Sequence, residues 1–122
     1  MIKDVVDLEI YRGALRLLPE VYFLVKKLPK SENDLSLQVK RSAKSIASNI
    51  AEGFAKRASE KEFKRFLRIS LGSSDEVITH LRTIAVVQPY LLIQARDLAE
   101  KYKVLSKRIN TLCSVWKSGG TF

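Results

Sequence analysis

Apolar residues return at steps of three and four along most of the chain, in four long stretches that each span several turns. Steps of this size place the apolar side chains on one face of an α-helix, which has 3.6 residues per turn. Stretches with the two-residue alternation of a β-strand are absent from the sequence. With hydrophobic residues at 46% and charged residues at 29% of the composition, the pattern predicts a packed all-α protein.

Prolines and polar segments separate the four stretches. Pro29 begins a polar segment that ends at Asp34, and Pro89 interrupts the chain between the last two stretches. Ser59 followed by Glu62 has the spacing of a capping box, in which the hydroxyl and the carboxylate each accept a backbone N–H. The predicted helices occupy residues 7–27, 35–56, 60–87 and 91–117.

The apolar stripes indicate which face of each helix is buried. In the first helix Asp7 is the predicted N-cap and Pro19 the predicted bend, and the stripe consists of Leu8, Tyr11, Leu15, Leu18, Tyr22 and Val25. The second stripe consists of Val39, Ala43, Ile46, Ala47, Ile50 and Phe54. The fourth is a heptad seam of Leu91, Ala95, Leu98, Tyr102, Leu105, Ile109, Leu112 and Trp116. Short connections between such helices predict one antiparallel up-and-down four-helix bundle domain over residues 1–122.

A polar stripe runs beside the apolar one on the second helix and consists of Ser42, Ser45, Asn49 and Glu52. If the last two are buried they need hydrogen-bond partners, and we expect these near Gly72 and Ser73 of the third helix, where they would fix the helix register. The alternative is an exposed polar edge. Because Gly72 has no side chain, the segment Gly72-Ser73-Ser74 is also the predicted point of close helix contact.

Residues that could carry catalysis or bind a metal are few and scattered. Cys113 is the single cysteine and falls on the apolar seam of the fourth helix, where a thiol usually packs as an apolar group. Glu76 and His80 are interpreted as a surface pair, because a helix-bundle di-iron site needs two Glu-x-x-His motifs. The sequence has no Cys-x-x-Cys pair and no glycine-rich phosphate loop. We therefore expect a non-enzymatic protein without metal or cofactor.

The N-terminal residues and the length of the apolar stretches indicate where in the cell the protein is located. Met1-Ile2-Lys3-Asp4 lacks the cationic segment and apolar run of a signal peptide, and no apolar stretch is long enough to span a bilayer. A single cysteine also suits a reducing environment. These features predict a cytoplasmic protein.

Positive charge is concentrated in the middle third of the chain. The formal net charge is +9, from 22 Lys and Arg against 13 Asp and Glu, and residues 36–70 hold nine basic and three acidic side chains, a net of +6. The nine basic residues are Lys40, Arg41, Lys44, Lys56, Arg57, Lys61, Lys64, Arg65 and Arg68. The last four share one helix face, which is the geometry of a cationic ridge for phosphate groups. The sequence thus predicts a nucleic-acid-binding surface.

Other interpretations of these charges stay open. They can be a solvated surface, neutralised in part by Glu52, Glu60 and Glu62, or a contact for an acidic protein or a membrane surface. Phe63 and Phe66 belong to the apolar stripe of the third helix, so no aromatic side chain is expected among the charges for stacking on bases. Contacts to the nucleic-acid backbone are therefore predicted, rather than sequence-specific recognition.

A resemblance to a known family is carried by the segment Ser45-Ile46-Ala47-Ser48-Asn49-Ile50-Ala51-Glu52-Gly53-Phe54. It is similar to the four-helix-bundle proteins encoded in intervening sequences of bacterial 23S rRNA genes. Segments 7–11, 28–30, 38–42 and 62–67, followed by Gly72-Ser73, also resemble the family pattern in order, so the resemblance covers about residues 7–115. The motif residues are Ser45, Asn49, Glu52, Gly53, Gly72 and Ser73. Ala47 stands where many members have proline, Tyr11 where tryptophan is frequent, and Ser70 in a segment that is often alanine.

The resemblance implies a bundle that assembles as a homopentameric ring. It also implies a kinship with accessory variability proteins of diversity-generating retroelements, which bind nucleic acid and a reverse transcriptase. Five copies would carry a formal charge of 5 × 9 = +45. The leading hypothesis is a basic homo-oligomeric scaffold that binds RNA or DNA through backbone electrostatics. The alternative is a protein-interaction scaffold for an acidic partner or a reverse transcriptase, with incidental binding of nucleic acid.

Overall fold

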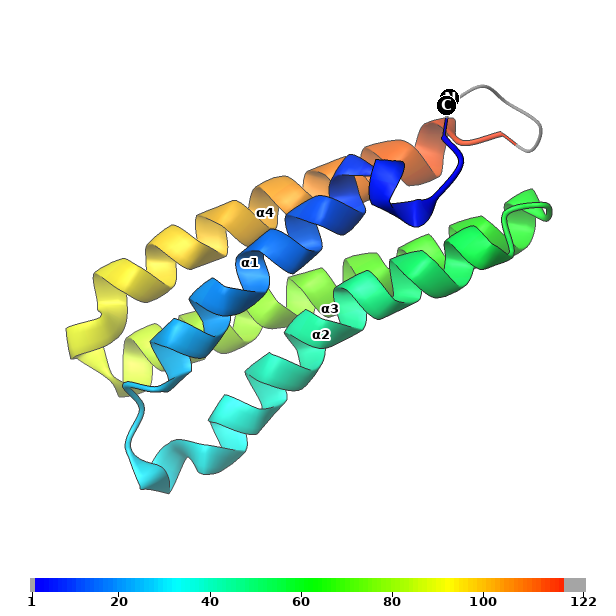
Figure 1. The fold of residues 1–122 in the computed structure, drawn as a ribbon. Coiled ribbons are helices and arrows are strands. Elements are labelled where there is room, and N and C mark those ends of the chain that lie inside the picture. The colour runs from blue at the N-terminus through cyan, green and yellow to red at the C-terminus, as the bar shows by residue number, and fades with distance from the viewer. Residues whose placement is uncertain (1, 118–122) are drawn as a thin grey trace.

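The computed structural model describes residues 2–117 as an all-α bundle of four long helices (Figure 1). The helices are α1 (Glu9–Val25), α2 (Asn33–Ala55), α3 (Glu60–Val87) and α4 (Leu92–Val115), with short 3-10 turns at Val5–Asp7, Lys30–Glu32 and Pro89–Leu91. Each helix packs against the next, and α4 closes the bundle against α1. The predicted up-and-down four-helix bundle is confirmed. No helix among the described residues is long and apolar enough to cross a membrane.

The antiparallel arrangement gives the bundle two ends formed by different segments (Figure 1). At one end, called the α2–α3 end, the turn between α2 and α3 lies beside the start of α1 and the end of α4. At the other, called the α3–α4 end, the connection from α3 to α4 lies beside the connection from α1 to α2. The Tyr90 hydroxyl joins these two connections, because it donates a hydrogen bond of 2.6 Å to the backbone carbonyl of Lys27.

Apolar side chains from all four helices fill the centre of the bundle. The stripes predicted for α2 and α4 are confirmed, because all of their members are buried except Leu112, which is half-buried. Trp116 follows α4 and packs edge-to-face on Phe63, with 4.6 Å between the ring centroids. Cys113 is also buried, as expected for a core thiol.

The stripe predicted for α1 is wrong at two positions. Leu15 and Tyr22 are 42% and 37% exposed, and Tyr11 and Leu18 are only partly buried. The buried face consists of Ile10, Ala14, Leu17, Val21, Leu24 and Val25. The apolar face of this helix is wide, so a stripe shifted by one residue fits the helical period almost equally well.

The start of α1 also differs from the prediction. Asp7 is not the N-cap of the helix but the last residue of the preceding 3-10 turn. Its carboxylate accepts the backbone N–H groups of Lys3 and Asp4 at 2.8 and 2.9 Å, and these hydrogen bonds lower the pKa of Asp7. Leu8 occupies the N-cap position without a side-chain hydrogen bond. The helix then continues through Pro19.

Close contact between α2 and α3 occurs at Gly53 rather than at Gly72. A Cβ atom added to Gly53 would lie 2.6 Å from the Cβ of Phe66 and 3.0 Å from a ring carbon of Phe63, which is closer than carbon atoms pack. Gly72 is exposed, and a Cβ added there would meet no atom within 4 Å. The prediction is therefore wrong for Gly72, which α3 turns to the solvent. It is right for the rest of the segment, because Ser73 contacts Ser45 of α2 and Ser74 contacts Ser106 of α4.

Gly53→Ala is expected to lower the free energy of unfolding by about 1–3 kcal/mol, because the added methyl group overpacks the contact between α2 and α3. Gly72→Ala is the matched control and is expected to raise that free energy by up to about 1 kcal/mol, because alanine has the higher helix propensity and the site is open. Urea unfolding followed by circular dichroism measures both. Equal effects of the two substitutions would contradict the contact at Gly53.

Candidate nucleic-acid interface

Six of the nine predicted basic residues lie together at the α2–α3 end. They are called the turn cluster and comprise Lys56, Arg57, Lys61, Lys64, Arg65 and Arg68. The first two stand just beyond α2, and the other four occupy the first three turns of α3. The short turn between Ala55 and Glu60 makes α3 run back along α2, and this brings the two groups to one end of the bundle.

The other three predicted residues, Lys40, Arg41 and Lys44, do not belong to this cluster. Lys44 precedes Lys56 by twelve residues, which is about 18 Å along the helix axis. Lys40 lies over the Tyr22 ring of α1, with its Nζ 5.0 Å from the ring centroid, whereas Arg41 lines a polar groove between α2 and α3. The structure therefore directs Lys40 toward α1 and Arg41 toward α3 instead of adding them to one ridge.

Three carboxylates neutralise part of the turn cluster. The ion pairs are Glu52–Lys56 at 3.6 Å, Glu60–Lys64 at 4.0 Å and Glu62–Arg65 at 3.1 Å. Arg57, Lys61 and Arg68 make no ion pair with a carboxylate of residues 2–117. The six cations of the turn cluster and their three carboxylate partners have a net charge of 6 − 3 = +3.

The predicted capping box at the start of α3 is half formed. Ser59 Oγ accepts the Glu62 N–H at 3.2 Å, as expected. The Glu62 carboxylate, however, accepts the Arg65 Nε–H at 3.1 Å. This hydrogen bond is the main cause of a lowered pKa of Glu62, to which the charges of Lys56 and Lys61 add. Glu62 therefore stays ionised near neutral pH and holds the Arg65 guanidinium in place.

Two aromatic rings contact cations of the turn cluster. Arg57 Cζ lies 3.9 Å from the centroid of the buried Phe54 ring, and the second ring is Phe66. Phe66 is half-buried, with Arg65 Cζ 4.4 Å and Lys56 Nζ 5.9 Å from its ring centroid. The expectation that no aromatic side chain is interleaved with the cations is therefore wrong for Phe66. It is correct for Phe63, which is fully buried. The Phe66 ring makes cation–π contacts with both side chains and so limits their motion.

The polar stripe of α2 is partly a helix contact and partly an exposed edge. Ser45 Oγ lies 2.9 Å from Ser73 Oγ, so a hydroxyl pair crosses from α2 to α3. Asn49 donates its amide to Ser45 O at 2.8 Å and to Ser45 Oγ at 2.9 Å. Glu52 is exposed and pairs with Lys56. The prediction that Asn49 and Glu52 bond across the helix interface is therefore wrong. Ser45 makes the link to Ser73 instead, and Asn49 supports it from within its own helix.

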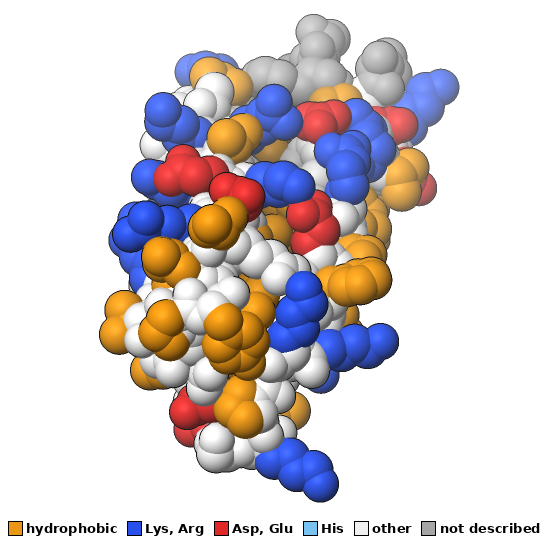
Figure 2. Space-filling model, turned by 90° about the vertical axis from the view of Figure 1, so that its left-hand side faces the viewer, with side chains coloured by type: hydrophobic (Ala, Val, Ile, Leu, Met, Phe, Trp, Pro, Cys, Tyr) orange, Lys and Arg blue, Asp and Glu red, His pale blue; other side chains and the backbone are white. Residues whose placement is uncertain are grey.

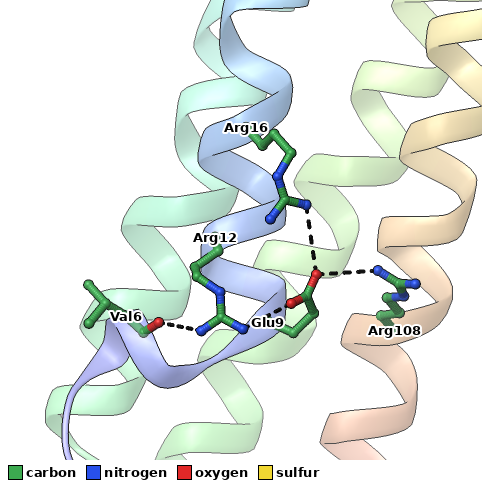
Figure 3. A network of polar contacts seen from close by, with 5 residues as sticks. All are labelled: Val6, Glu9, Arg12, Arg16 and Arg108. Atoms are coloured by element: carbon green, nitrogen blue, oxygen red, sulfur yellow. Dashed lines mark hydrogen bonds and ion pairs between the residues drawn. The ribbon is translucent and has the colours of Figure 1, made fainter.

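A second group of cations lies on the α1–α4 side of the bundle and has no counterpart among the predicted site residues. Arg12, Arg16 and Arg108 surround the carboxylate of Glu9 (Figure 3). This group could not be recognised from the sequence. Residues 1–35 carry six basic and six acidic side chains and so have no net charge, and Arg108 lies 99 residues beyond Glu9. Only the packing of α1 on α4 brings the four side chains together.

The side chains considered for catalysis or metal binding are Glu76, His80 and Cys113, and they do not form a common site. Among residues 2–117, no group of three or more His, Cys, Asp or Glu side chains is placed to hold a metal ion. His80 Nε2 lies 3.8 Å from Glu76 Oε1, which is the expected pair, although the His80 side chain is only 16% exposed. Cys113 Sγ accepts a hydrogen bond from Arg68 Nη1 at 3.7 Å and donates one to the Lys64 carbonyl at 3.8 Å. The thiol thus links α4 to the turn cluster.

The family of the chain follows from comparison with known proteins. Residues 6–111 match the family model described as 23S rRNA-intervening sequence protein. This span includes α1, α2, α3 and most of α4, and it contains the whole turn cluster. No curated protein matches the sequence.

Ser45→Ala is expected to lower the free energy of unfolding by about 1–2 kcal/mol, because it removes the hydrogen-bond partner of the Ser73 hydroxyl and one acceptor of Asn49. Ser48→Ala is the matched control, with an expected change within about 0.5 kcal/mol. Ser48 is exposed, and its hydroxyl donates to the Ser45 carbonyl of its own helix. Urea unfolding measures both. Ser45→Ala with Ser73→Ala should cost less than the sum of the single substitutions, and additive costs would contradict the hydroxyl pair.

Proposed function

We propose that this chain, which belongs to the 23S rRNA-intervening sequence protein family, is a basic, non-enzymatic cytoplasmic scaffold that binds RNA or DNA. The observation that carries this proposal is the turn cluster, which presents six cations with only three carboxylate partners at one end of the bundle. In this proposal the scaffold is a homo-oligomer, with five copies in a ring.

Binding by the turn cluster relies on the phosphate backbone of the nucleic acid. Each cation that neutralises a phosphate releases condensed counterions, so the affinity falls as the salt concentration rises. Arg57, Lys61 and Arg68, which make no ion pair with a carboxylate of residues 2–117, supply the first such contacts. Contacts of this kind position a protein on nucleic acid but carry no sequence information. RNA and DNA are therefore bound without strong sequence preference.

The α3–α4 end supplies the surface for self-association. Val86 and Ile93 are 77% and 76% exposed, and Tyr90 and Phe23 are exposed as well. These four residues are called the end patch. Phe23 stands one turn before Lys27, to which Tyr90 donates its hydrogen bond. Figure 2 looks onto this end and shows hydrophobic side chains gathered in its lower half, with Lys and Arg side chains on both flanks.

An assembly through the end patch is consistent with binding of nucleic acid at the other end. Exposed apolar side chains in a group mark contact surfaces, because their burial removes apolar area from water. The turn cluster lies at the opposite end of the bundle and stays free in such an assembly (Figure 1). A ring of five copies carries a formal charge of 5 × 9 = +45, which attracts polyanions from a distance.

The alternative candidate is a protein-interaction scaffold for an acidic protein or a reverse transcriptase. The end patch favours it, because such patches also bind other proteins. In this alternative, nucleic acid is bound only incidentally. The two candidates differ in how strongly salt and the turn cluster control the affinity for nucleic acid.

Arg65→Glu combined with Arg68→Glu is expected to weaken binding of structured RNA, single-stranded RNA and duplex DNA by at least about tenfold, because two phosphate contacts become repulsive. For duplex DNA, the slope of log affinity against log salt concentration is expected to become shallower by about 1.8, which is about 0.9 for each lost contact. Fluorescence anisotropy across a salt series measures both quantities.

Arg82→Glu combined with Arg96→Glu is the matched control for this experiment. Both arginines are exposed and line a groove between α3 and α4 near the α3–α4 end, and the change in net charge is the same. The groove also contains Val86 of the end patch, so light scattering must first show that the control has the same mass as the wild type. We then expect the control to keep most of the affinity. Wild-type binding that is insensitive to salt, or equal losses in both variants, would favour the protein-interaction scaffold.

Val86→Glu combined with Ile93→Glu is expected to convert the proposed pentamer into smaller species, because the contact would have to bury unpaired charges. Light scattering measures the mass, and circular dichroism checks that the helices are kept. Ile69→Glu combined with Val104→Glu is the control, since both residues are exposed apolar side chains outside the end patch. A monomeric wild type, or a pentamer that only the control disrupts, would contradict this assembly.

A further inference from the structure

One carboxylate holds three guanidinium groups on the α1–α4 side of the bundle (Figure 3). Arg12 Nη2 lies 2.9 Å from Glu9 Oε2, while Arg108 Nη1 and Arg16 Nη1 lie 3.5 and 3.7 Å from Glu9 Oε1. Arg108 comes from α4 and the other three residues from the first half of α1. The four residues are called the Glu9 cluster. All four side chains are about half exposed, so a ligand in solution can reach them.

The three arginines differ in how fully their N–H donors are used. Arg12 donates to the Val6 carbonyl as well as to Glu9, and is therefore held at two nitrogen atoms. Arg16 and Arg108 have no polar contact among residues 2–117 other than the one longer contact to Glu9. A guanidinium has five N–H donors in a fork that suits phosphate oxygens. Most donors of these two residues are thus available for a ligand.

The Glu9 cluster keeps a positive charge after its internal pairing. Three guanidinium groups and one carboxylate leave 3 − 1 = +2. The next ion pair along the groove, Lys101 with Glu20 at 2.7 Å, is neutral. The Arg12 hydrogen bond, followed by the charges of Arg16 and Arg108, lowers the pKa of Glu9. The carboxylate is therefore ionised near neutral pH, and the excess charge persists.

The groove beneath Arg16 and Arg108 has an apolar floor. It is lined by Leu17 and Leu105, which are buried, and by Gly13, where an added Cβ would lie 3.5 Å from a methyl carbon of Leu105. A side chain at Gly13 would therefore contact α4 at ordinary van der Waals distance and would narrow the groove. Charges at the rim of an apolar groove are screened less than charges surrounded by water. This placement favours binding of an anion between the two arginines.

The position of the groove connects it with the turn cluster. Arg68 of the turn cluster reaches Cys113 on one side of α4, and Arg108 reaches Glu9 on the side facing α1. Arg108 and Cys113 are five residues apart, about 7.5 Å along the helix axis. Basic groups thus flank the last turns of α4 on both sides. A nucleic-acid backbone that crosses α4 there would meet both groups.

We propose that Arg16 and Arg108 form a binding site for a phosphate group, with Glu9, which Arg12 holds in place, as the residue that positions the two guanidinium groups. The phosphate belongs to the backbone of the RNA or DNA strand that the turn cluster binds, and in this respect the inference rests on the proposed function. Glu9 competes with the phosphate for the same donors and so weakens the binding.

The first test uses inorganic pyrophosphate and does not depend on nucleic acid. Pyrophosphate is titrated into the full chain while the arginine Nε–H signals are followed by NMR. We expect the signals of Arg16 and Arg108 to shift with a saturable dependence, and the binding to be lost in Arg16→Gln combined with Arg108→Gln. Lys26→Gln combined with Lys30→Gln removes the same charge at the α3–α4 end and is expected to leave the shifts unchanged. Absence of saturable shifts in the wild type would overturn the site.

The second test measures binding of duplex RNA by fluorescence anisotropy across a salt series. Arg16→Gln combined with Arg108→Gln is expected to weaken binding about threefold to tenfold and to make the salt slope shallower by about 1, which corresponds to one phosphate contact. Glu9→Gln is expected to strengthen binding about threefold, because it removes the competing charge. A merely structural role for Glu9 predicts the opposite sign. Circular dichroism and a thermal melt check that each variant is folded.

The outcomes separate this inference from the proposed function. If Arg65→Glu with Arg68→Glu weakens RNA binding while the Arg16, Arg108 and Glu9 substitutions match the lysine control, the inference is overturned and the proposed function stands. If the wild type binds pyrophosphate at Arg16 and Arg108 but no nucleic acid, the site takes free phosphate and its assignment to a nucleic-acid backbone is overturned.

Discussion

The packing of α2 against α3 at Gly53 is the contact on which the basic surface depends. Because Gly53 has no Cβ, the Cβ of Phe66 fits directly against α2. The same contact brings the end of α2 to the start of α3, where Lys56 and Arg65 both approach the Phe66 ring. Further along the two helices, the hydroxyl pair of Ser45 and Ser73 keeps them in register. One close approach therefore positions both the core and the charges that lie over it.

Two carboxylates hold arginine side chains in place but neutralise only part of their positive charge. Glu62 accepts a hydrogen bond from Arg65, and Glu9 accepts one from Arg12. In both cases this hydrogen bond is the main reason that the pKa of the carboxylate is lowered. Each carboxylate gathers more positive charge than it neutralises, since the cations outnumber the carboxylates in both places. The surface is thus ordered and still strongly positive, as a phosphate-binding surface needs to be.

The sequence predicts some parts of this structure better than others for physical reasons. The stripes of α2 and α4 could be predicted because few apolar residues lie beside them, whereas the apolar face of α1 is wider than the part that packing buries, so that Leu15 is exposed. Gly53 and Gly72 look alike in the sequence, and only the rotation of α2 and of α3 about their own axes decides which glycine meets the neighbouring helix. The turn cluster could be predicted because its members follow one another along the chain. The Glu9 cluster could not, because Arg108 comes from the opposite end of the chain.

The two ends of the bundle are suited to different kinds of contact. The α2–α3 end carries paired and unpaired cations that stay hydrated, and long-range attraction to a polyanion needs no shape match. The α3–α4 end exposes Val86 and Ile93, whose burial requires a complementary surface within van der Waals distance. Self-association at the apolar end adds copies of the charged end, and linked weak contacts bind a polymer more tightly than separate ones. In the proposed ring, the weak phosphate contacts of each copy act together, and the proposed binding of RNA or DNA therefore needs no recognition of bases.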